Sequence, residues 1–272
     1  KSGETSCWGW SDLSVSDAAQ RGAKRAAELA KKFKDGDRSK AGRYGYGDRP
    51  LREELLKEFK DESGELIAAL TRNSYGCLIL NTSNLLMIDI DSDESGSSKP
   101  SGSFLSRLFG DGGRKDKQVT GLEEISAKAK SWLALNSSWS LRIYRTAAGF
   151  RILAPHATIS PGDSVVERVF EHFACDPLYR KLCNTQKSFR ARLTPKPWRC
   201  RYRVPNIAWP WSGEDDKGKF TEWEKGYSRA SEGYASCKLE IELGSGSIVH
   251  GFEEIIKLHD STTRASEALH LA

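Results

Sequence analysis

The sequence lacks the features of membrane-spanning, secreted and disulfide-bonded proteins. No apolar run approaches the roughly 20 residues that a membrane helix requires. The first residues, Lys1-Ser-Gly-Glu, contain no apolar signal core. Six cysteines in 272 residues are far sparser than in small secreted scaffolds. We therefore expect an intracellular protein with free thiols and no membrane association.

Several catalytic signatures are also missing. The chain has no Gly-x-Ser-x-Gly, P-loop or dinucleotide fingerprint, and we find no internal repeat. Four potential zinc ligands exist, namely His172, Cys175, Cys183 and Cys200. Their spacing is not that of paired zinc knuckles, so structural zinc is not expected.

The composition is that of a globular protein, with 38% hydrophobic residues, 29% charged residues and a net charge of +5. Residues 1–70 are interpreted as an N-terminal helical segment packed on the core, with helices over 14–34 and 50–60. Residues 71–272 then form the main domain. Within it, the Ser-, Gly-, Lys- and Asp-rich stretch 92–119 is expected to be a mobile insertion.

The patterns beyond residue 71 predict an α+β fold, with an antiparallel or mixed sheet and helices on one face. Two hairpins are expected, one joining 75–80 to 85–91 and the other joining 139–145 to 150–154. The remaining expectations are helices at 123–135 and 165–183, an irregular basic region at 184–233, a strand at 234–243 and a last apolar run, Ile255–Leu258, before His259 and Asp260.

The most informative segment is the apolar strand Leu85–Asp91, which ends in Asp89-Ile90-Asp91. Because side chains alternate along a strand, Asp89 and Asp91 share one face and the apolar residues between them share the other. Two adjacent carboxylates repel each other unless a cation lies between them. Oxygen ligands of this kind suit Mg²⁺ or Mn²⁺. The alternative is a strand that simply runs out into an acidic loop.

The second predicted hairpin gathers groups that bind phosphate. Arg145, Thr146 and Arg151 surround a turn of small residues that ends at Gly149. Small residues let a phosphate approach the backbone, where two arginines and a hydroxyl can hold it. The alternative is an ordinary hairpin with solvated arginines.

These motifs resemble, in order and spacing, those of the archaeo-eukaryotic primase–polymerase superfamily, over about residues 75–260. The matching segments are Met87-Ile-Asp-Ile-Asp91, Arg145-Thr-Ala-Ala-Gly-Phe-Arg151 and Ile255-Ile-Lys-Leu-His-Asp260. The resemblance implies an RRM-like core and a metal-dependent nucleotidyltransferase. It also implies that Asp89 and Asp91 are catalytic metal ligands and that Asp260 follows a late hydrophobic strand as a third catalytic acid.

Two positions depart from that family pattern. Arg151 stands where the family usually has a His, and an arginine can hold a triphosphate but cannot act as a neutral imidazole. This difference bears on polymerisation more than on phosphate binding. For the third acid, Glu240 and Glu242 compete with Asp260.

The stretch 187–203 is basic and aromatic, and no acid interrupts it. Charge combined with stacking surface is typical of sites for single-stranded nucleic acid. The residues expected to contact a strand are Arg190, Arg192, Lys196, Trp198 and Arg199. The alternative is a solvated basic edge whose aromatic residues fill the core.

Three functions therefore remain open. The first is divalent-metal-dependent nucleotidyl or phosphoryl transfer, with a nucleoside triphosphate and single-stranded DNA or RNA as partners. The second is a non-catalytic protein that binds single-stranded nucleic acid. The third is a metal-dependent nuclease that uses the same acids.

Overall fold

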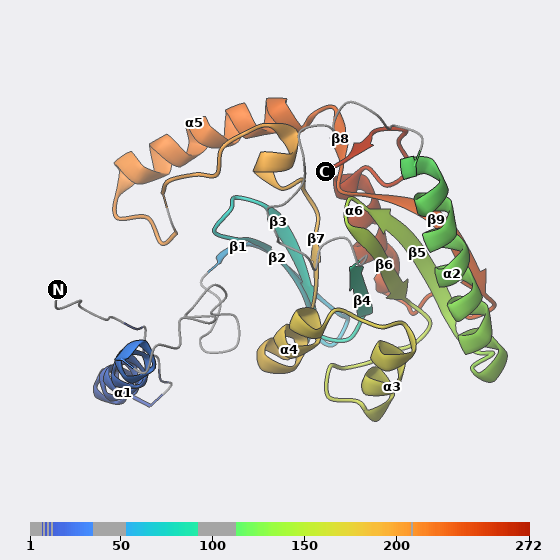
Figure 1. Cartoon of the computed structure of the whole chain (residues 1–272), viewed down its shortest axis with the longest axis horizontal. Helices are drawn as coiled ribbons and strands as arrows, with labels where there is room; N and C mark the ends of the chain where they lie inside the picture. The colour runs from blue at the N-terminus through green and yellow to red at the C-terminus, as the bar shows by residue number, and fades with distance from the viewer. Residues whose placement is uncertain are drawn as a thin grey trace. The chain divides into compact units, whose positions relative to one another are not determined.

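The computed structural model describes residues 7, 9, 11, 13–34, 53–91, 113–207 and 209–272, and the side chains of residues 32, 33 and 113–120 are not described. The chain divides into two units, Lys1–Leu51 and Arg52–Ala272 (Figure 1). The helix predicted over 14–34 is confirmed as α1 (Val15–Lys34) in the first unit. The boundary predicted near residue 70 falls at the end of a strand inside the second unit.

The second unit contains two four-stranded sheets in which all pairs of strands are antiparallel. The first sheet has the order β1 (Glu54–Lys60), β2 (Leu66–Arg72), β3 (Leu78–Thr82) and β7 (Phe189–Arg192). The second sheet has the order β4 (Leu86–Asp91), β6 (Gly149–Ala154), β5 (Ser140–Thr146) and β9 (Cys237–Gly244). A short parallel pair joins β8 (Tyr234–Ala235) to β10 (His270–Leu271).

The helices of this unit alternate with the strands along the chain. They are α2 (Gly113–Leu135), α3 (Ser164–His172), α4 (Pro177–Gln186), the 3-10 helix η3 (Pro197–Cys200), α5 (Glu214–Ser231) and α6 (Phe252–Thr263). Among the described helices, none is long and apolar enough to cross a membrane. The expected α+β class with antiparallel pairing is therefore confirmed at this level.

Helices pack on both faces of the second sheet, so the prediction of helices on one face is wrong. Gly121 of α2 lies against the ring of Phe150. The next residue along β6 points to the opposite face, and there Arg151 contacts His259 of α6. Residues paired across antiparallel strands share a face, so Asp89, opposite Arg151, lies on the α6 side.

The first predicted hairpin is wrong, whereas the second is confirmed. β3 and β4 belong to different sheets, and the chain crosses between them at a bend where the Thr82 hydroxyl donates to the Leu85 carbonyl at 2.8 Å. Most positions of both strands are buried and need cover on two faces, which a simple hairpin cannot provide. β5 and β6 pair as predicted, with Thr146 opposite Gly149.

Other local predictions also change. Residues 54–60 form β1 rather than part of a helix, and β7 and α5 lie in the region predicted to be irregular. The predicted helix 165–183 is present as α3 and α4, separated by a break in which Ala174 has a φ of 53°. The predicted insertion lies largely outside the described residues, and its last part, from Gly113, belongs to α2.

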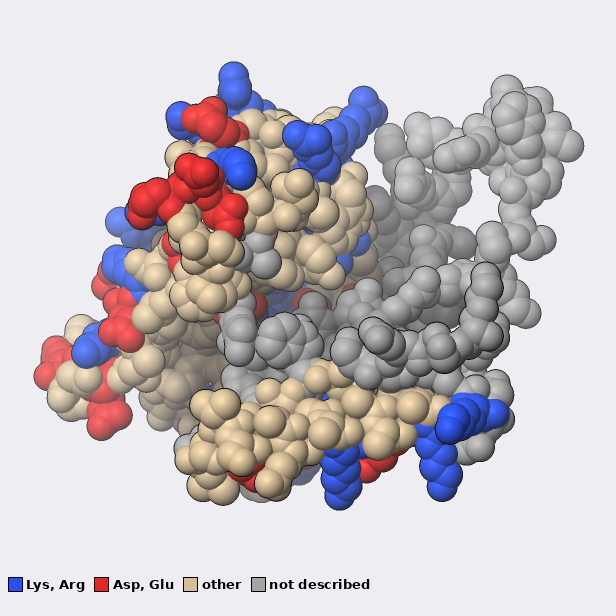
Figure 2. Space-filling view, turned by 90° about the vertical axis from the view of Figure 1, so that its left-hand side faces the viewer, with Lys and Arg blue, Asp and Glu red and all other residues tan. Residues whose placement is uncertain are grey.

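The described core forms two clusters. The larger cluster spans both sheets and includes Leu80, Leu86 and Ile152, each fully buried. The smaller cluster is aromatic and lies between α5 and η3, where Trp223 stacks on Tyr227 with ring centroids 5.0 Å apart. On the described surface in Figure 2, acidic and basic side chains are interspersed. The second unit thus has a packed interior that holds the strand ends in place.

Candidate functional site

Asp89 and Asp91 lie at the end of β4, on the edge of the second sheet. Leu86, Ile88 and Ile90 are buried, whereas Asp89 is partly exposed and Asp91 is exposed. The strand alternation therefore places the two carboxylates on the same face. A largely buried strand thus presents two acids on one face at its C-terminal end.

β6 supplies the residues next to these acids. Asp89 pairs with Arg151 and Asp91 pairs with Gly149 in the antiparallel register. The β5–β6 turn, which contains the predicted phosphate-binding residue Thr146, is therefore beside Asp91. The Thr146 hydroxyl accepts a hydrogen bond of 3.3 Å from the Ala148 N–H within that turn. The pairing of β4 with β6 therefore brings the acid motif and the β5–β6 turn next to each other.

Cations of β6, β7, η3 and the loop between β7 and η3 act on the same acids. Burial raises the pKa of Asp89, and Arg151, Arg192 and Lys196 oppose that rise. Burial together with the charge of Asp89 raises the pKa of Asp91, while Lys196 and Arg199 oppose it. The structure therefore brings three of the five predicted strand-binding residues to the acid pair.

The cations themselves repel one another. Burial lowers the pKa of Lys196, and the nearby charges of Arg192 and Arg199 lower it further. Burial also lowers the pKa of Arg192, whose Nη1 donates to the Thr194 carbonyl at 2.8 Å. Acids that repel each other and cations that repel each other within one region form an arrangement suited to a charged ligand with both metal and phosphate groups.

Asp176 is an acid of this region that the sequence reading missed. Its backbone N–H donates to the Asp89 carbonyl at 2.9 Å, and its charge raises the pKa of both Asp89 and Asp91. Its carboxylate caps α4 by accepting from the Tyr179 N–H at 2.6 Å. The Asp-Pro pair at a helix start is a readable capping signal. Nothing in that signal indicates that α4 begins beside β4.

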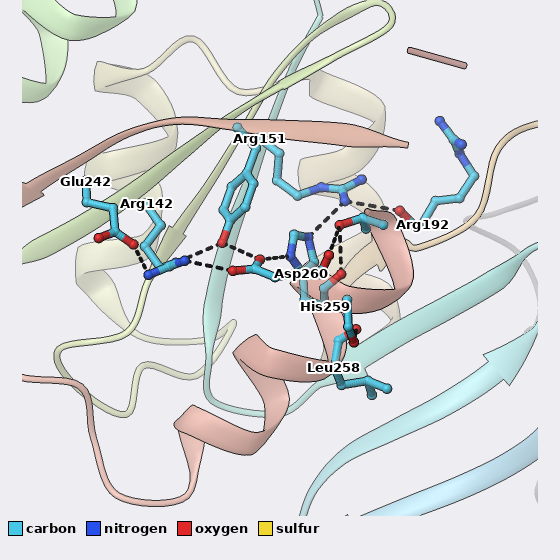
Figure 3. Close-up of polar contacts among 10 residues, drawn as sticks. Arg142, Arg151, Arg192, Glu242, Leu258, His259 and Asp260 are labelled. Carbon is cyan, nitrogen blue, oxygen red and sulfur yellow. Dashed lines mark hydrogen bonds and ion pairs between the residues drawn. The ribbon is translucent and has the colours of Figure 1, made fainter. Parts of the chain in front are cut away.

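Asp260 lies in helix α6, so the prediction that it follows a late hydrophobic strand is wrong. Its side chain belongs to a polar network of its own. Its Oδ2 accepts from Arg142 at 2.7 Å, and its Oδ1 accepts from the Tyr144 hydroxyl at 2.7 Å. Figure 3 shows the network continuing through His259 to Arg151, and from Arg142 to Glu242. Within the residues that the structure describes, Asp260 thus bonds inside this network, which ends at Arg151, the strand partner of Asp89.

Other predicted binding residues have protein partners. Arg145 forms an ion pair of 2.9 Å with Glu240, one of the competing third acids, on neighbouring β9. Arg190 forms an ion pair of 2.6 Å with Glu53, and both side chains are almost buried. Both arginines therefore form ion pairs with glutamates of the protein itself.

Trp198 is the exposed aromatic residue of the basic stretch. Its side chain is 49% exposed, and its ring meets Tyr75 edge-on with centroids 5.2 Å apart. The Lys196 ammonium lies 5.7 Å from the centre of the Trp198 ring. An aromatic surface therefore adjoins the cations that act on the acid pair.

The four candidate zinc ligands are distributed over different environments. His172 Nε2 lies 2.8 Å from the Lys128 carbonyl, and Cys175 and Cys183 are buried in the larger core cluster. Cys200 belongs to the aromatic cluster. Within the described ranges, no group of three or more His, Cys, Asp or Glu side chains is placed to hold a metal ion.

The chemistry of Asp89 and Asp91 fits a divalent cation. Their pKa values are raised because burial and mutual repulsion penalise the two charges, and a cation relieves both effects. Mg²⁺ is often held by only one or two carboxylates, with water and substrate phosphates completing its shell. A site with two carboxylates and nearby phosphate-binding cations matches that pattern.

Comparison of the chain with protein-family models, with curated proteins and with solved structures finds no match.

Proposed function

We propose that this protein is a divalent-metal-dependent nucleotidyl- or phosphoryltransferase of the primase–polymerase type, acting on nucleoside triphosphates and single-stranded nucleic acid. The observation that carries the proposal is the acid pair Asp89 and Asp91, on which cations from β6 and from the segment after β7 converge. This combination suits a reaction in which negative charge must be held on phosphate oxygens while a hydroxyl attacks.

Strand order supports the relationship to an RRM-like core. β4 and β5 lie on either side of β6 and are connected through α2, which is the split β-α-β arrangement. The acids at the C-terminal end of β4 and the turn between β5 and β6 then lie at the same end of the sheet, where Asp91 pairs with Gly149. β9 extends the sheet beyond β5.

Each group has a role that its position supports. Asp89 and Asp91 would hold the divalent cation, which supplies Lewis-acid polarisation of a phosphoryl oxygen. Arg151 and Arg192 bind and orient the phosphates, because a guanidinium forms paired hydrogen bonds with phosphate oxygens. Lys196 adds positive charge at the same place, and Trp198 offers a surface on which a base stacks.

The thiols support an intracellular location as part of this proposal. All six cysteines are unpaired, and five of them are buried. Free thiols persist in reducing compartments, where glutathione and thioredoxin keep them reduced.

Incorporation of radiolabelled nucleotides onto a primed single strand in Mn²⁺ tests the proposal. We expect incorporation by the wild-type protein and a loss of at least about 100-fold in Asp89→Asn and Asp91→Asn, since each removes a metal ligand. Asp215→Asn is the matched control, because it removes the same charge from an exposed position on α5.

The same assay separates the other two functions. Shortening of the labelled strand with loss in the same variants would identify a nuclease. Salt-dependent strand binding, with neither incorporation nor cleavage in Mg²⁺ or Mn²⁺, would identify a binding protein without catalysis. Either result overturns nucleotidyl transfer.

A further inference from the structure

The hydrogen bonds of Asp260 account for both of its carboxylate oxygens. Oδ1 accepts from the Tyr144 hydroxyl and lies 2.8 Å from His259 Nδ1, while Oδ2 accepts from Arg142. The Asp260 side chain is 25% exposed, and these bonds lower its pKa against the opposing effect of burial. This carboxylate is therefore engaged by side chains of β5 and α6.

The protonation pattern of His259 follows from its two neighbours. Its Nε2 lies 3.3 Å from Arg151 Nη1, and a guanidinium can only donate. Nε2 must accept that hydrogen bond, so the proton of the neutral ring is on Nδ1 and points to Asp260. His259 is fully buried, and burial lowers its pKa to about 4, so the neutral ring prevails at neutral pH. Asp260 thereby fixes the tautomer that Arg151 needs.

Arg151 is held from two sides. Its Nη1 also donates to the Arg192 carbonyl at 3.1 Å, and the residue is only 5% exposed. Within the described part of the chain, Nη1 makes these bonds, whereas Nε and Nη2 make none. Figure 3 shows the guanidinium above His259, between α6 and the Arg192 backbone. The remaining N–H groups are thus available for a ligand beside Asp89.

We propose that Asp260 and His259 are positioning residues, which hold the Arg151 guanidinium beside Asp89 to receive a phosphate group, and that Asp260 is not a third metal ligand. The phosphate ligand in this inference rests on the proposed function. Asp89, Arg151 and Tyr144 lie side by side across β4, β6 and β5, and His259 of α6 contacts two of them, Arg151 and Tyr144. The T-shaped contact of His259 with Tyr144, at 4.7 Å between centroids, fixes the imidazole above these three residues.

Two substitutions of His259 separate its contacts. His259→Asn places an amide near Nδ1 and loses the acceptor for Arg151, whereas His259→Gln can place an oxygen near Nε2. With the full chain, Mn²⁺ and inorganic triphosphate in a calorimeter, we expect the Asn variant to bind roughly tenfold more weakly, because a hydrogen bond to a charged group is lost. The Gln variant should retain most of the wild-type affinity.

Ile256→Val is the matched control on α6. This buried change removes one methyl group without touching the network, and it should lower the melting temperature and leave triphosphate affinity unchanged. The Arg151→Lys background gives a second test. If His259 acts through Arg151, His259→Asn has little further effect there. A tenfold loss that persists undiminished in that background would overturn the proposal, as would wild-type affinity in a folded His259→Asn protein.

Mn²⁺ binding alone decides the status of Asp260. We expect Asp260→Asn to leave the Mn²⁺ dissociation constant unchanged and to weaken triphosphate binding. An increase of about tenfold or more in the Mn²⁺ constant would identify Asp260 as a metal ligand and overturn the inference.

One measurement is independent of the proposed function. In ¹⁵N NMR spectra of the wild-type protein at neutral pH, His259 should be a neutral ring with its proton on Nδ1, and Asp260→Asn should disturb that signal together with the Arg151 side-chain signal. A protonated ring, or an Arg151 signal unaffected by the change, would contradict the positioning role. If nucleotide incorporation and triphosphate binding are both absent, the proposed function fails, and these spectra still decide the contact.

Discussion

At the scale of single residues, Asp89 and Asp91 stand in surroundings that oppose their ionisation. Burial raises both pKa values, the charge of Asp176 raises both further, and the charge of Asp89 adds to the rise at Asp91. Such groups reduce the stability of the free protein and stabilise it when a cation is bound. The acid pair should therefore be visible in stability measurements even without a substrate.

Asp89→Asn should stabilise the metal-free protein, with a gain that grows as the pH rises above about 4, because the folded-state pKa of Asp89 is raised. A raised carboxyl pKa gives stability that is fully present below about pH 4 and is lost as the pH rises through the folded-state pKa. Asparagine does not ionise and avoids that loss. Melting temperatures at several pH values, with and without Mn²⁺, test this. The idea fails if the variant is less stable than the wild type at pH 8, or if Mn²⁺ stabilises both proteins equally.

Arg190→Ala and Lys196→Ala should differ in kind, although both remove a cation from the basic stretch. Arg190 is nearly buried against Glu53, so its removal should cost about 2–4 kcal/mol of unfolding free energy. Lys196 faces the acid pair, and its removal should reduce the salt dependence of single-strand binding by about one unit of slope. Urea denaturation and binding at several salt concentrations measure the two effects. A reduced slope in a folded Arg190→Ala protein would contradict this division.

The sequence allows the orientation of Asp89 and Asp91 to be predicted, because strand alternation is a local property. It does not allow Arg190 to be separated from Arg192, since the two share a strand and a face in β7. What separates them is Glu53, more than 130 residues earlier in the chain, which reaches Arg190 at the edge of the first sheet. Asp176 escaped prediction for the same reason, because its capping role is local and its contact with β4 is not.

At the scale of elements, α5 depends on close packing against Tyr202. A Cβ on Gly226 would lie 2.1 Å from the Tyr202 hydroxyl oxygen and 2.9 Å from the ring carbon that carries it. Tyr202 also lies beside Trp223, with ring centroids 6.0 Å apart. The glycine therefore allows the helix to approach the aromatic cluster. By contrast, a Cβ on Gly218 of the same helix meets nothing within 4 Å.

Gly226→Ala and Gly218→Ala should accordingly have opposite effects. The first crowds Tyr202 and should reduce the unfolding free energy by about 1–3 kcal/mol. The second adds a better helix former at an open position and should increase it by up to about 1 kcal/mol. Urea denaturation of both variants measures the difference. Equal changes of the same sign would show that α5 does not pack on Tyr202 as described.

Local sequence patterns predict some elements correctly, whereas the strand expected before Asp260 is a helix. α1, the β5–β6 hairpin and β9 follow from periodicity and turn residues that lie next to one another in the chain. The resemblance to the primase–polymerase pattern predicts a strand around Ile255 and Ile256, which form a short apolar run. The buried residues Phe252, Ile255, Ile256, His259 and Thr263 repeat at helical spacing, which becomes apparent only over the full length of α6.

At the scale of the whole molecule, the described core belongs to the second unit. Both buried clusters consist of residues between Phe59 and Ala265, and β1 and β2 contribute Phe59, Ile67 and Ala68. This dependence on β1 and β2 explains why a boundary after residue 70 would cut through a sheet. The crossover from β3 to β4 has no local sequence signal, because it is determined by the distant partners β7 and β6.

A fragment that begins at Arg52 should fold cooperatively, and one that begins at Asn73 should not. The longer fragment keeps the second unit intact, whereas the shorter one loses two strands and the Glu53 partner of Arg190. Circular dichroism during urea denaturation distinguishes a sharp transition from a gradual one. Cooperative folding of the fragment from Asn73, or its absence in the fragment from Arg52, would contradict this division.

The buried cysteines give the candidate site reporters of its own. Cys175 contacts the Asp89 backbone, Cys77 lies in the field of Arg192 and Lys196, and Cys237 lies in that of Arg151. Burial raises the pKa of each thiol, so each reacts slowly until the surrounding structure opens. Rates of native-state alkylation, resolved by peptide mass, would therefore report separately how often the structure opens around Asp89, around Arg192 and Lys196, and around Arg151. No substitution would be needed, because the reacting thiols are those of the natural chain.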